Sequence, residues 1–165
     1  MKEDVNVIEF SSGGVYTLLL FLPKEVTVTV GSLGKQKFPR GYYTYTGSAL
    51  GRGTTCLKHR ITRHLRKEKR KFWHIDYLLA DENVSIAAVV AAQTKGKMEC
   101  NLNNYIKNIK GAKVQVYGFG ASDCKKRCGT HLLHFPEVEK AELLIQKLTG
   151  YLKSVTSIFS VHVVC

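Results

Sequence analysis

The sequence has few of the features that mark membrane, secreted or repetitive proteins. Its longest apolar run, Val15 to Leu22, ends at Pro23 and is far too short to span a bilayer. The N-terminal segment MKEDVNVIEF is acidic and has neither the basic nor the apolar region of a signal peptide. Proline occurs only 3 times, and no repeat or low-complexity tract interrupts the chain. We therefore expect a cytoplasmic protein without a membrane contact, folded as one domain over residues 1–165.

Acidic residues are also scarce relative to basic ones. Against 25 Lys and Arg stand only 13 Asp and Glu, which gives a formal net charge of +12. Nine of the basic residues fall between Arg52 and Lys71, with Glu68 as the one acid. Such a cluster predicts a polyphosphate partner, DNA first and RNA as an alternative, although a solvated basic helix face has the same composition. The predicted nucleic-acid contacts are Lys58, Arg63, Arg66, Lys67, Lys69, Arg70 and Lys71.

Hydrophobic periodicity predicts an α+β fold. Apolar or alternating segments predict strands, and helical spacing predicts amphipathic helices, one of them with an apolar stripe through Leu57, Ile61, Leu65 and Phe72. The predicted strands cover residues 14–22, 25–30, 42–46, 85–92, 114–117 and 155–164, and the other helices cover 73–79, 97–109 and 137–148.

Four features in chain order resemble the signature of the GIY-YIG nuclease superfamily. They are Gly14-Val15-Tyr16, Tyr45-Thr46-Gly47, the helical pair Arg60 and His64, and Glu99 on a later helix. The segments at 41–48, 72–78 and 118–124 are most similar to the archaeal Uri-type branch, and the resemblance covers about residues 12–135. In the family a short hairpin usually separates the two tripeptides, whereas residues 21–40 here add a strand and a turn.

The resemblance implies a small, mainly antiparallel sheet flanked by helices. The insertion would form an extra hairpin, and residues 136–165 a C-terminal helix-strand extension. It also implies a metal-dependent DNA endonuclease that hydrolyses a phosphodiester. Tyr16 would be the general base, Tyr45 its partner or the group that orients the water, and Glu99 the ligand of one Mg²⁺ or Mn²⁺ ion.

The residue types agree with this chemistry. Arg60 and His64 lie one helical turn apart, and a guanidinium fork at Arg60 matches the oxygens of a phosphate, unless it is only a surface cation. His74 and Asp76 are candidates for proton transfer or for orienting Arg60. Tyrosine has a reference pKa of about 10, so Tyr16 acting as base requires Arg60, His64 and a metal to lower that pKa. Otherwise Tyr16 and Tyr45 are core aromatics with a hydrogen-bonded hydroxyl.

Glu99 falls in helical register with the inward positions Leu102 and Ile106. A carboxylate on an apolar stripe costs free energy unless it is paired, protonated or bound to a metal. The alternatives to metal binding are a salt bridge to a buried lysine or a place in the first turn of the helix.

A second cluster lies near the C-terminus. Cys124, Cys128, His131 and His134 give the pattern C-x3-C-x2-H-x2-H, which is tighter than zinc sites usually are, so structural Zn²⁺ is kept only as an alternative. Asp123 is a further candidate ligand there. The 5 cysteines, an odd number without an export signal, predict reduced thiols.

Three hypotheses follow from these observations. The first is an endonuclease, the second a non-catalytic nucleic-acid-binding module on the same fold, and the third a zinc-stabilised interaction protein. The segment 137–165 lies beyond the recognised region and is a candidate interface, so the oligomeric state stays open.

Overall fold

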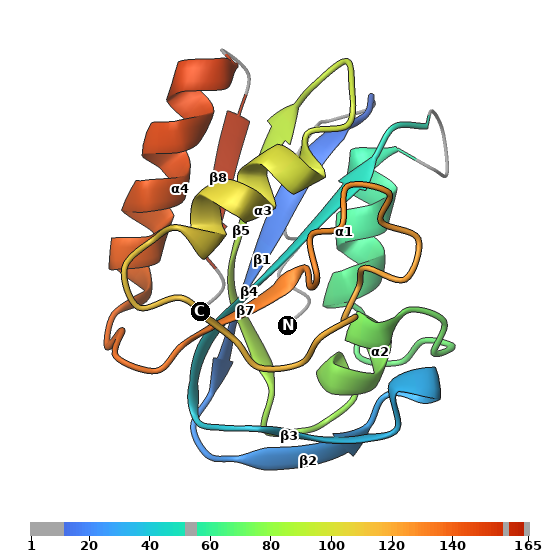
Figure 1. Cartoon of the computed structure of the whole chain (residues 1–165). Helices are drawn as coiled ribbons and strands as arrows, with labels where there is room; N and C mark the ends of the chain where they lie inside the picture. Colours follow the sequence, from blue (N-terminus) through green and yellow to red (C-terminus); the bar gives the residue numbers. More distant parts are fainter. Residues whose placement is uncertain (1–11, 52–55, 157–158, 164–165) are drawn as a thin grey trace, which may run out of the picture.

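The structure is a computed structural model that describes residues 12–51, 56–156 and 159–163. Its main element is a six-stranded sheet of order β6-β7-β4-β1-β5-β8, in which all neighbouring strands are antiparallel (Figure 1). The α+β prediction with a mainly antiparallel sheet is confirmed. The strands are β1 (Gly14–Leu22), β4 (Gly41–Ala49), β5 (Ser85–Gln93), β6 (Lys113–Val114), β7 (Leu132–Phe135) and β8 (Phe159–Val163).

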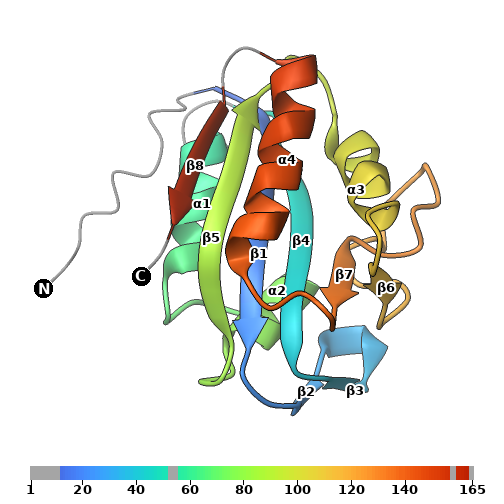
Figure 2. The ribbon, with the colours of Figure 1, turned by 90° about the vertical axis from the view of Figure 1, so that its left-hand side faces the viewer.

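Helices cover both faces of the sheet. Helices α1 (Leu57–Leu65) and α2 (His74–Leu79) lie on one face, and α3 (Glu99–Lys107) and α4 (Ala141–Val155) on the other (Figure 2). The alternation of side chains along β1 explains these two layers. Tyr16, Leu18 and Leu20 pack in the cluster under α1 and α2, whereas Val15 and Leu19 pack under α3 and α4.

The residues between the two tripeptides form the extra hairpin, as predicted. Strand β2 (Val26–Thr29) pairs with β3 (Lys35–Phe38) in a separate two-stranded sheet, and the 3-10 turn η1 (Gly31–Leu33) joins them. Strand β3 was not predicted, because Lys35 and Lys37 are exposed and only Phe38 is buried. The hairpin lies at the end of the sheet away from the C-terminal end of β4 (Figure 1).

The C-terminal extension is also as predicted, a helix followed by a strand. Leu144, Leu148 and Leu152 of α4 are buried against the sheet, so this face of the helix belongs to the core. Strand β8 pairs with β5 at the edge of the sheet. None of the helices described is long and apolar enough to cross a membrane.

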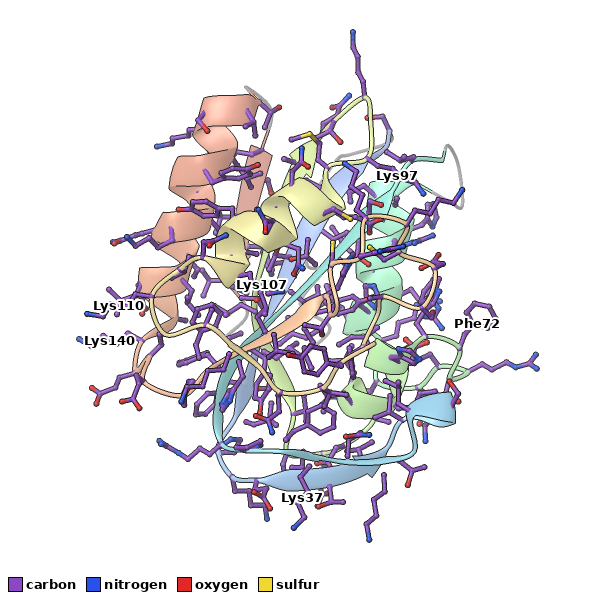
Figure 3. The ribbon with its side chains drawn as sticks, in the orientation of Figure 1. Lys37, Phe72, Lys97, Lys107, Lys110 and Lys140 are labelled. Atoms are coloured by element: carbon purple, nitrogen blue, oxygen red, sulfur yellow. The ribbon has the colours of Figure 1, made fainter. Side chains whose placement is uncertain are left out.

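Helix α1 is shorter than the apolar spacing predicted. It ends at Leu65, and Arg66 is already extended. Phe72 is 75% exposed and points away from the molecule, so its place on the apolar stripe is wrong (Figure 3). The reason is the charge run after Leu65, in which like charges three and four residues apart repel one another on a helix. The lysines from Lys67 to Lys71 therefore lie in a loop and not on a basic helix.

Strand β7 was not predicted, and β6 is shorter and begins earlier than the predicted 114–117 strand. The four residues of β7, Leu132–Phe135, are all buried, and the strand lies between β4 and β6. An apolar run of this length has no readable period, which is why the sequence did not reveal it.

Candidate active site and thiol cluster

A cleft of about 800 Å³ opens beside the C-terminal end of β4. It is bordered by α1, by the beginning of α3 and by the loop that leads to β7 (Figure 1). Of the predicted site residues, the cleft is lined by Tyr16, Tyr45, Arg60, His74, Glu99, Asp123, Cys124 and His131. Its other charged walls are Lys97, Lys125 and Lys126, so cations outnumber acids there.

Tyr16, which lines this cleft, forms a buried pair with His64, which does not line it. Tyr16 Oη lies 2.7 Å from His64 Nε2, and the two side chains are 2% and 2% exposed. Burial lowers the pKa of His64 to about 3, so the imidazole is neutral near pH 7. A neutral imidazole has one donor and one acceptor nitrogen, and we assign Nε2 as the acceptor of the Tyr16 hydroxyl. This assignment leaves the ring proton on Nδ1, which has no partner in the described part of the chain.

The expected lowering of the Tyr16 pKa is not found in the protein alone, although Arg60 acts in the expected direction. Burial and the neighbouring Tyr45 raise the Tyr16 pKa well above its usual value, and Arg60 opposes them. Because His64 is neutral, it contributes no positive charge to stabilise a phenolate. Burial and Glu99 likewise raise the pKa of Tyr45. In this structure both phenols are protonated near pH 7.

Gly47 makes room for the Tyr16 ring. The two residues are opposite each other on β1 and β4. A Cβ atom on Gly47 would lie 2.6 Å from Tyr16 Oη and 2.8 Å from the ring carbon that bears it. Gly14 is tighter still, because its Cβ would lie 2.0 Å from the Ala92 carbonyl oxygen of β5. The glycines of the two tripeptides therefore allow close strand packing around the tyrosine.

Arg60 is held at the mouth of the cleft. Its Nη1 donates to the Ser48 carbonyl at 3.0 Å, and its guanidinium carbon lies 4.7 Å from the centre of the Trp73 ring. The prediction that Asp76 orients Arg60 is wrong. The buried Asp76 carboxylate instead accepts two hydrogen bonds from Arg63, at 2.8 and 2.9 Å, and Arg63 lies 4.3 Å from the same Trp73 ring. Trp73 thus packs against both guanidinium groups.

His74 connects the cleft to the loop before β7. Its Nδ1 accepts the backbone N–H of Gly120 at 2.9 Å. Burial lowers the pKa of His74, so the ring is neutral and able to accept this bond. A backbone hydrogen bond of the ring with Gly118 opposes this lowering.

Glu99 is the first residue of α3 and is half-buried in the cleft wall. Its place in the first turn is one of the two alternatives to metal binding, and a carboxylate there is stabilised by the helix dipole. The other alternative, a salt bridge to a buried lysine, is not found among the residues described. The carboxylate therefore faces a solvent-filled space with no basic partner in that part of the chain.

The basic residues after Leu57 divide into two groups. Lys58, Arg66, Lys67, Arg70 and Lys71 are exposed. Arg63 is bound to Asp76, and Lys69 donates through Nζ to the carbonyls of His64 and Arg66 at 2.8 and 2.7 Å. Other lysines lie on distant parts of the surface, for example Lys37 on the hairpin and Lys110 beyond α3 (Figure 3). The positive charge is therefore spread over the molecule and is not confined to the cleft.

A cluster of soft donors adjoins the cleft. Ligand atoms of Cys100, Cys124, Cys128 and His131 all lie within 4.8 Å of one another, and the three cysteines are free thiols. Burial opposes ionisation of Cys124, but the Cys128 backbone and the His131 ring lower its pKa to about 6. Burial raises the pKa of Cys100 to about 12.

Two details of this cluster differ from the prediction. Cys100 was missed, because it is on α3, 24 residues before Cys124, and only the fold brings it close. His134 does not take part, since its Nε2 bonds with the Arg40 carbonyl at 3.0 Å and its ring stacks on Tyr43.

Searches among curated proteins and among solved structures give no match. Residues 15–153 match the family described as "Domain of unknown function DUF123". The matched segment reaches past residue 135, where the resemblance ended, and takes in nearly all of α4 but not β8. Because most of the chain matches, the protein belongs to the DUF123 family.

Proposed function

We propose that this protein is a divalent-metal-dependent DNA endonuclease of the GIY-YIG type. The observation that carries the proposal is the convergence of Tyr16 and Tyr45 from the sheet, Arg60 from α1 and Glu99 from α3 on one cation-rich cleft. These are the residues that the GIY-YIG resemblance implies for phosphodiester hydrolysis. The cleft is open and lined by four cations, which suits a polyphosphate backbone.

The donor set fits a single Mg²⁺ or Mn²⁺ ion at Glu99. The carboxylate has no ion pair in the described chain, and the cleft has room for the water ligands that Mg²⁺ keeps. Asp123 lines the same cleft and offers a second carboxylate. When bound, such an ion supplies positive charge that stabilises the phosphate and the leaving oxygen.

Tyr16 and His64 act together in activating the water. A water in the cleft gives its proton to Tyr16 Oη while the Tyr16 proton passes along the 2.7 Å hydrogen bond to His64 Nε2. The water oxygen bonds to phosphorus, and the opposite P–O ester bond breaks. The leaving oxygen takes a proton from solvent, and His64 later returns its proton to solvent. No free phenolate is needed, which is consistent with the raised Tyr16 pKa. Because a His64 pKa of about 3 makes the ring a weak base in the free protein, the relay requires the negative charge of the bound phosphate to raise that pKa.

Arg60 stabilises the charge that develops on the phosphate. Its Nη1 is engaged by the Ser48 carbonyl and its face by Trp73, which fixes the orientation of the remaining N–H groups. A donor held in advance in this way costs little reorganisation in the transition state. Lys97, Lys125 and Lys126 hold flanking phosphates.

The test is cleavage of a panel of labelled DNAs, comprising duplex, single-stranded, flapped, branched and damaged forms, with Mg²⁺ or Mn²⁺. We expect nicking of at least one form, abolished by a chelator. Removing one charge-stabilising donor typically costs about 10²- to 10³-fold in rate, so Glu99→Gln and Arg60→Ala should each lose at least that much. The matched controls are Glu82→Gln and Arg40→Ala, both at exposed positions outside the cleft lining. Equal rates in Glu99→Gln and Glu82→Gln would refute the assignment of Glu99.

One observation favours the second hypothesis, a non-catalytic nucleic-acid-binding module. Burial raises the Tyr16 pKa, so the phenolate that would act directly as a base is not formed in the free protein near pH 7. Such a module would bind DNA with a logarithmic salt slope of about −0.9 per phosphate contacted. It would bind equally well after Glu99→Gln and in the presence of a chelator, and it would cut no member of the panel.

A further inference from the structure

The soft donors beside the cleft have the geometry of a metal centre. The Sγ atoms of Cys100 and Cys124 are 3.6 Å apart. Zn–S bonds of about 2.3 Å in a tetrahedron place two sulfurs about 3.8 Å apart. A disulfide would require about 2.05 Å between the sulfur atoms. The four ligand atoms, all within 4.8 Å of one another, therefore leave a space of the size that one ion fills.

The His131 ring supplies an independent indication. It is 3% exposed, and its Nε2 is a buried atom without a hydrogen-bond partner among the described residues. The opposite nitrogen, Nδ1, lies 3.2 Å from the Thr46 carbonyl oxygen. A carbonyl only accepts, so Nδ1 carries the proton and Nε2 has a free lone pair. Metal-binding histidines are oriented in this way by a carbonyl on their second nitrogen.

We propose that Cys100, Cys124, Cys128 and His131 bind one Zn²⁺ ion in a tetrahedral structural site. Three sulfurs and an imidazole are a common ligand set for structural zinc, and thiolates do not suit Mg²⁺. Binding releases the thiol protons to solvent, so affinity falls at low pH. The four ligands close the coordination sphere, which leaves no position for substrate.

The zinc fixes the wall of the cleft. Glu99 directly precedes Cys100, and Asp123 directly precedes Cys124, so each carboxylate of the cleft is next to a zinc ligand in the chain. His131 makes two contacts with Thr46, the central residue of the second tripeptide. Its ring lies against the Thr46 carbonyl, and its backbone carbonyl accepts a hydrogen bond from the Thr46 N–H at 3.1 Å. The ion thereby ties α3 and the loop before β7 to β4. This positioning of Glu99 rests on the proposed function, whereas zinc binding itself does not.

The test is elemental analysis of protein purified from zinc-supplemented cells without chelator. We expect one zinc per chain that survives gel filtration. Cys100→Ser and His131→Asn should reduce the zinc content to background, and the matched control Cys56→Ala, a buried cysteine outside the cluster, should retain it. Wild-type protein without zinc, or with iron in its place, would overturn the proposal.

Cobalt substitution tests the ligand set and geometry of the site in the wild-type protein. Apo-protein titrated with Co²⁺ should show visible bands of a tetrahedral ion and thiolate-to-cobalt charge transfer, both ending at one equivalent and both reversed by Zn²⁺. A Cys100–Cys124 disulfide in protein as purified from zinc-supplemented cells, before any metal is removed, would contradict the proposal. If zinc is bound and no DNA is cut, the zinc site stands and the nuclease proposal fails. If the protein cuts DNA but never binds zinc, the nuclease proposal stands and the zinc site fails.

Discussion

The two faces of the sheet differ in what they bury. Under α3 and α4 the core is mainly aliphatic, built from residues such as Val15, Leu19 and Leu148. Under α1 and α2 the same sheet buries ionisable side chains, among them Tyr16, His64 and Asp76. Buried ionisable groups cost stability unless they are bonded. The comparison indicates that the buried ionisable groups of the site lie mainly on the face under α1 and α2, whereas the other face contributes to the site through the first turn of α3.

The largest expected effect is a loss of nicking activity, and it tests the face of the sheet under α1 and α2. Under the proposed function, Tyr16→Phe removes the hydroxyl that relays the proton of the attacking water. Loss of a general base typically costs about 10²- to 10⁴-fold in rate. Initial nicking rates would measure it, with Tyr43→Phe as control, because the Tyr43 hydroxyl bonds to the Pro39 carbonyl and does not line the cleft. Unchanged nicking by Tyr16→Phe would exclude the relay.

Asp76 should carry the largest effect on stability on this face. Asp76→Ala leaves Arg63 and the Phe72 and Trp73 N–H groups without their acceptor. Removing one partner of a buried ion pair costs about 3–5 kcal/mol, and the partial exposure of Arg63 places the effect near the lower end. Urea unfolding would measure the loss against the exposed control Glu82→Ala. A change as small as that of the control would mean that the pair adds nothing.

Leu148 tests the other face. Leu148→Ala should lower the free energy of unfolding by about 2–5 kcal/mol through lost burial and a cavity. Leu143, on the same helix, is 55% exposed, so Leu143→Ala is the matched control and should change little. The nicking rate per folded molecule should be unaffected. A specific loss of rate in folded Leu148→Ala would break the division between the faces.

His64 should give the smallest effect, a dependence of stability on pH. Its pKa is about 3 in the fold and about 6.5 in the unfolded chain, so between these values only the unfolded chain binds the proton. Stability is therefore full above pH 6.5 and falls as the pH decreases, by about 1.4 kcal/mol per pH unit at most. Unfolding curves from pH 7 to 4.5 avoid the titration of Asp76, whose lowered pKa takes effect only below about 3.9. His64→Gln should reduce the slope of the unfolding free energy against pH. An equal slope in that variant would mean that groups other than His64 cause the dependence.

Local pattern predicted most of the fold and part of the site. Strands β1 and β4 and the start of α1 followed from period and glycine signals within a few residues. The resemblance to the GIY-YIG signature pointed to Tyr16, Tyr45, Arg60 and Glu99, and the structure shows that all four line one cleft. Strands β1 and β4 and the start of α1 can be predicted because neighbouring residues in the sequence determine them.

The parts that were missed depend on contacts distant in sequence. Cys100 meets Cys124 only through the packing of α3 beside the loop before β7. Asp76 was a candidate partner of Arg60, but in the folded protein it binds Arg63. The protonation of Tyr16 and His64 depends on burial, which spacing alone does not give. Each of these outcomes is set by tertiary structure.

Strand β8 has a consequence for how far the chain can be shortened. It covers the edge of β5, pairing from Ala88 with Val163 to Ala92 with Phe159. A chain cut at residue 153, where the family match ends, would leave the apolar β5 with a row of unpaired N–H and C=O groups. Bare strand edges recruit strands from other molecules. We therefore expect the trimmed protein to self-associate through β5, because the residues of β5 are mostly buried whereas those of β8, the edge strand in the intact sheet, are partly exposed.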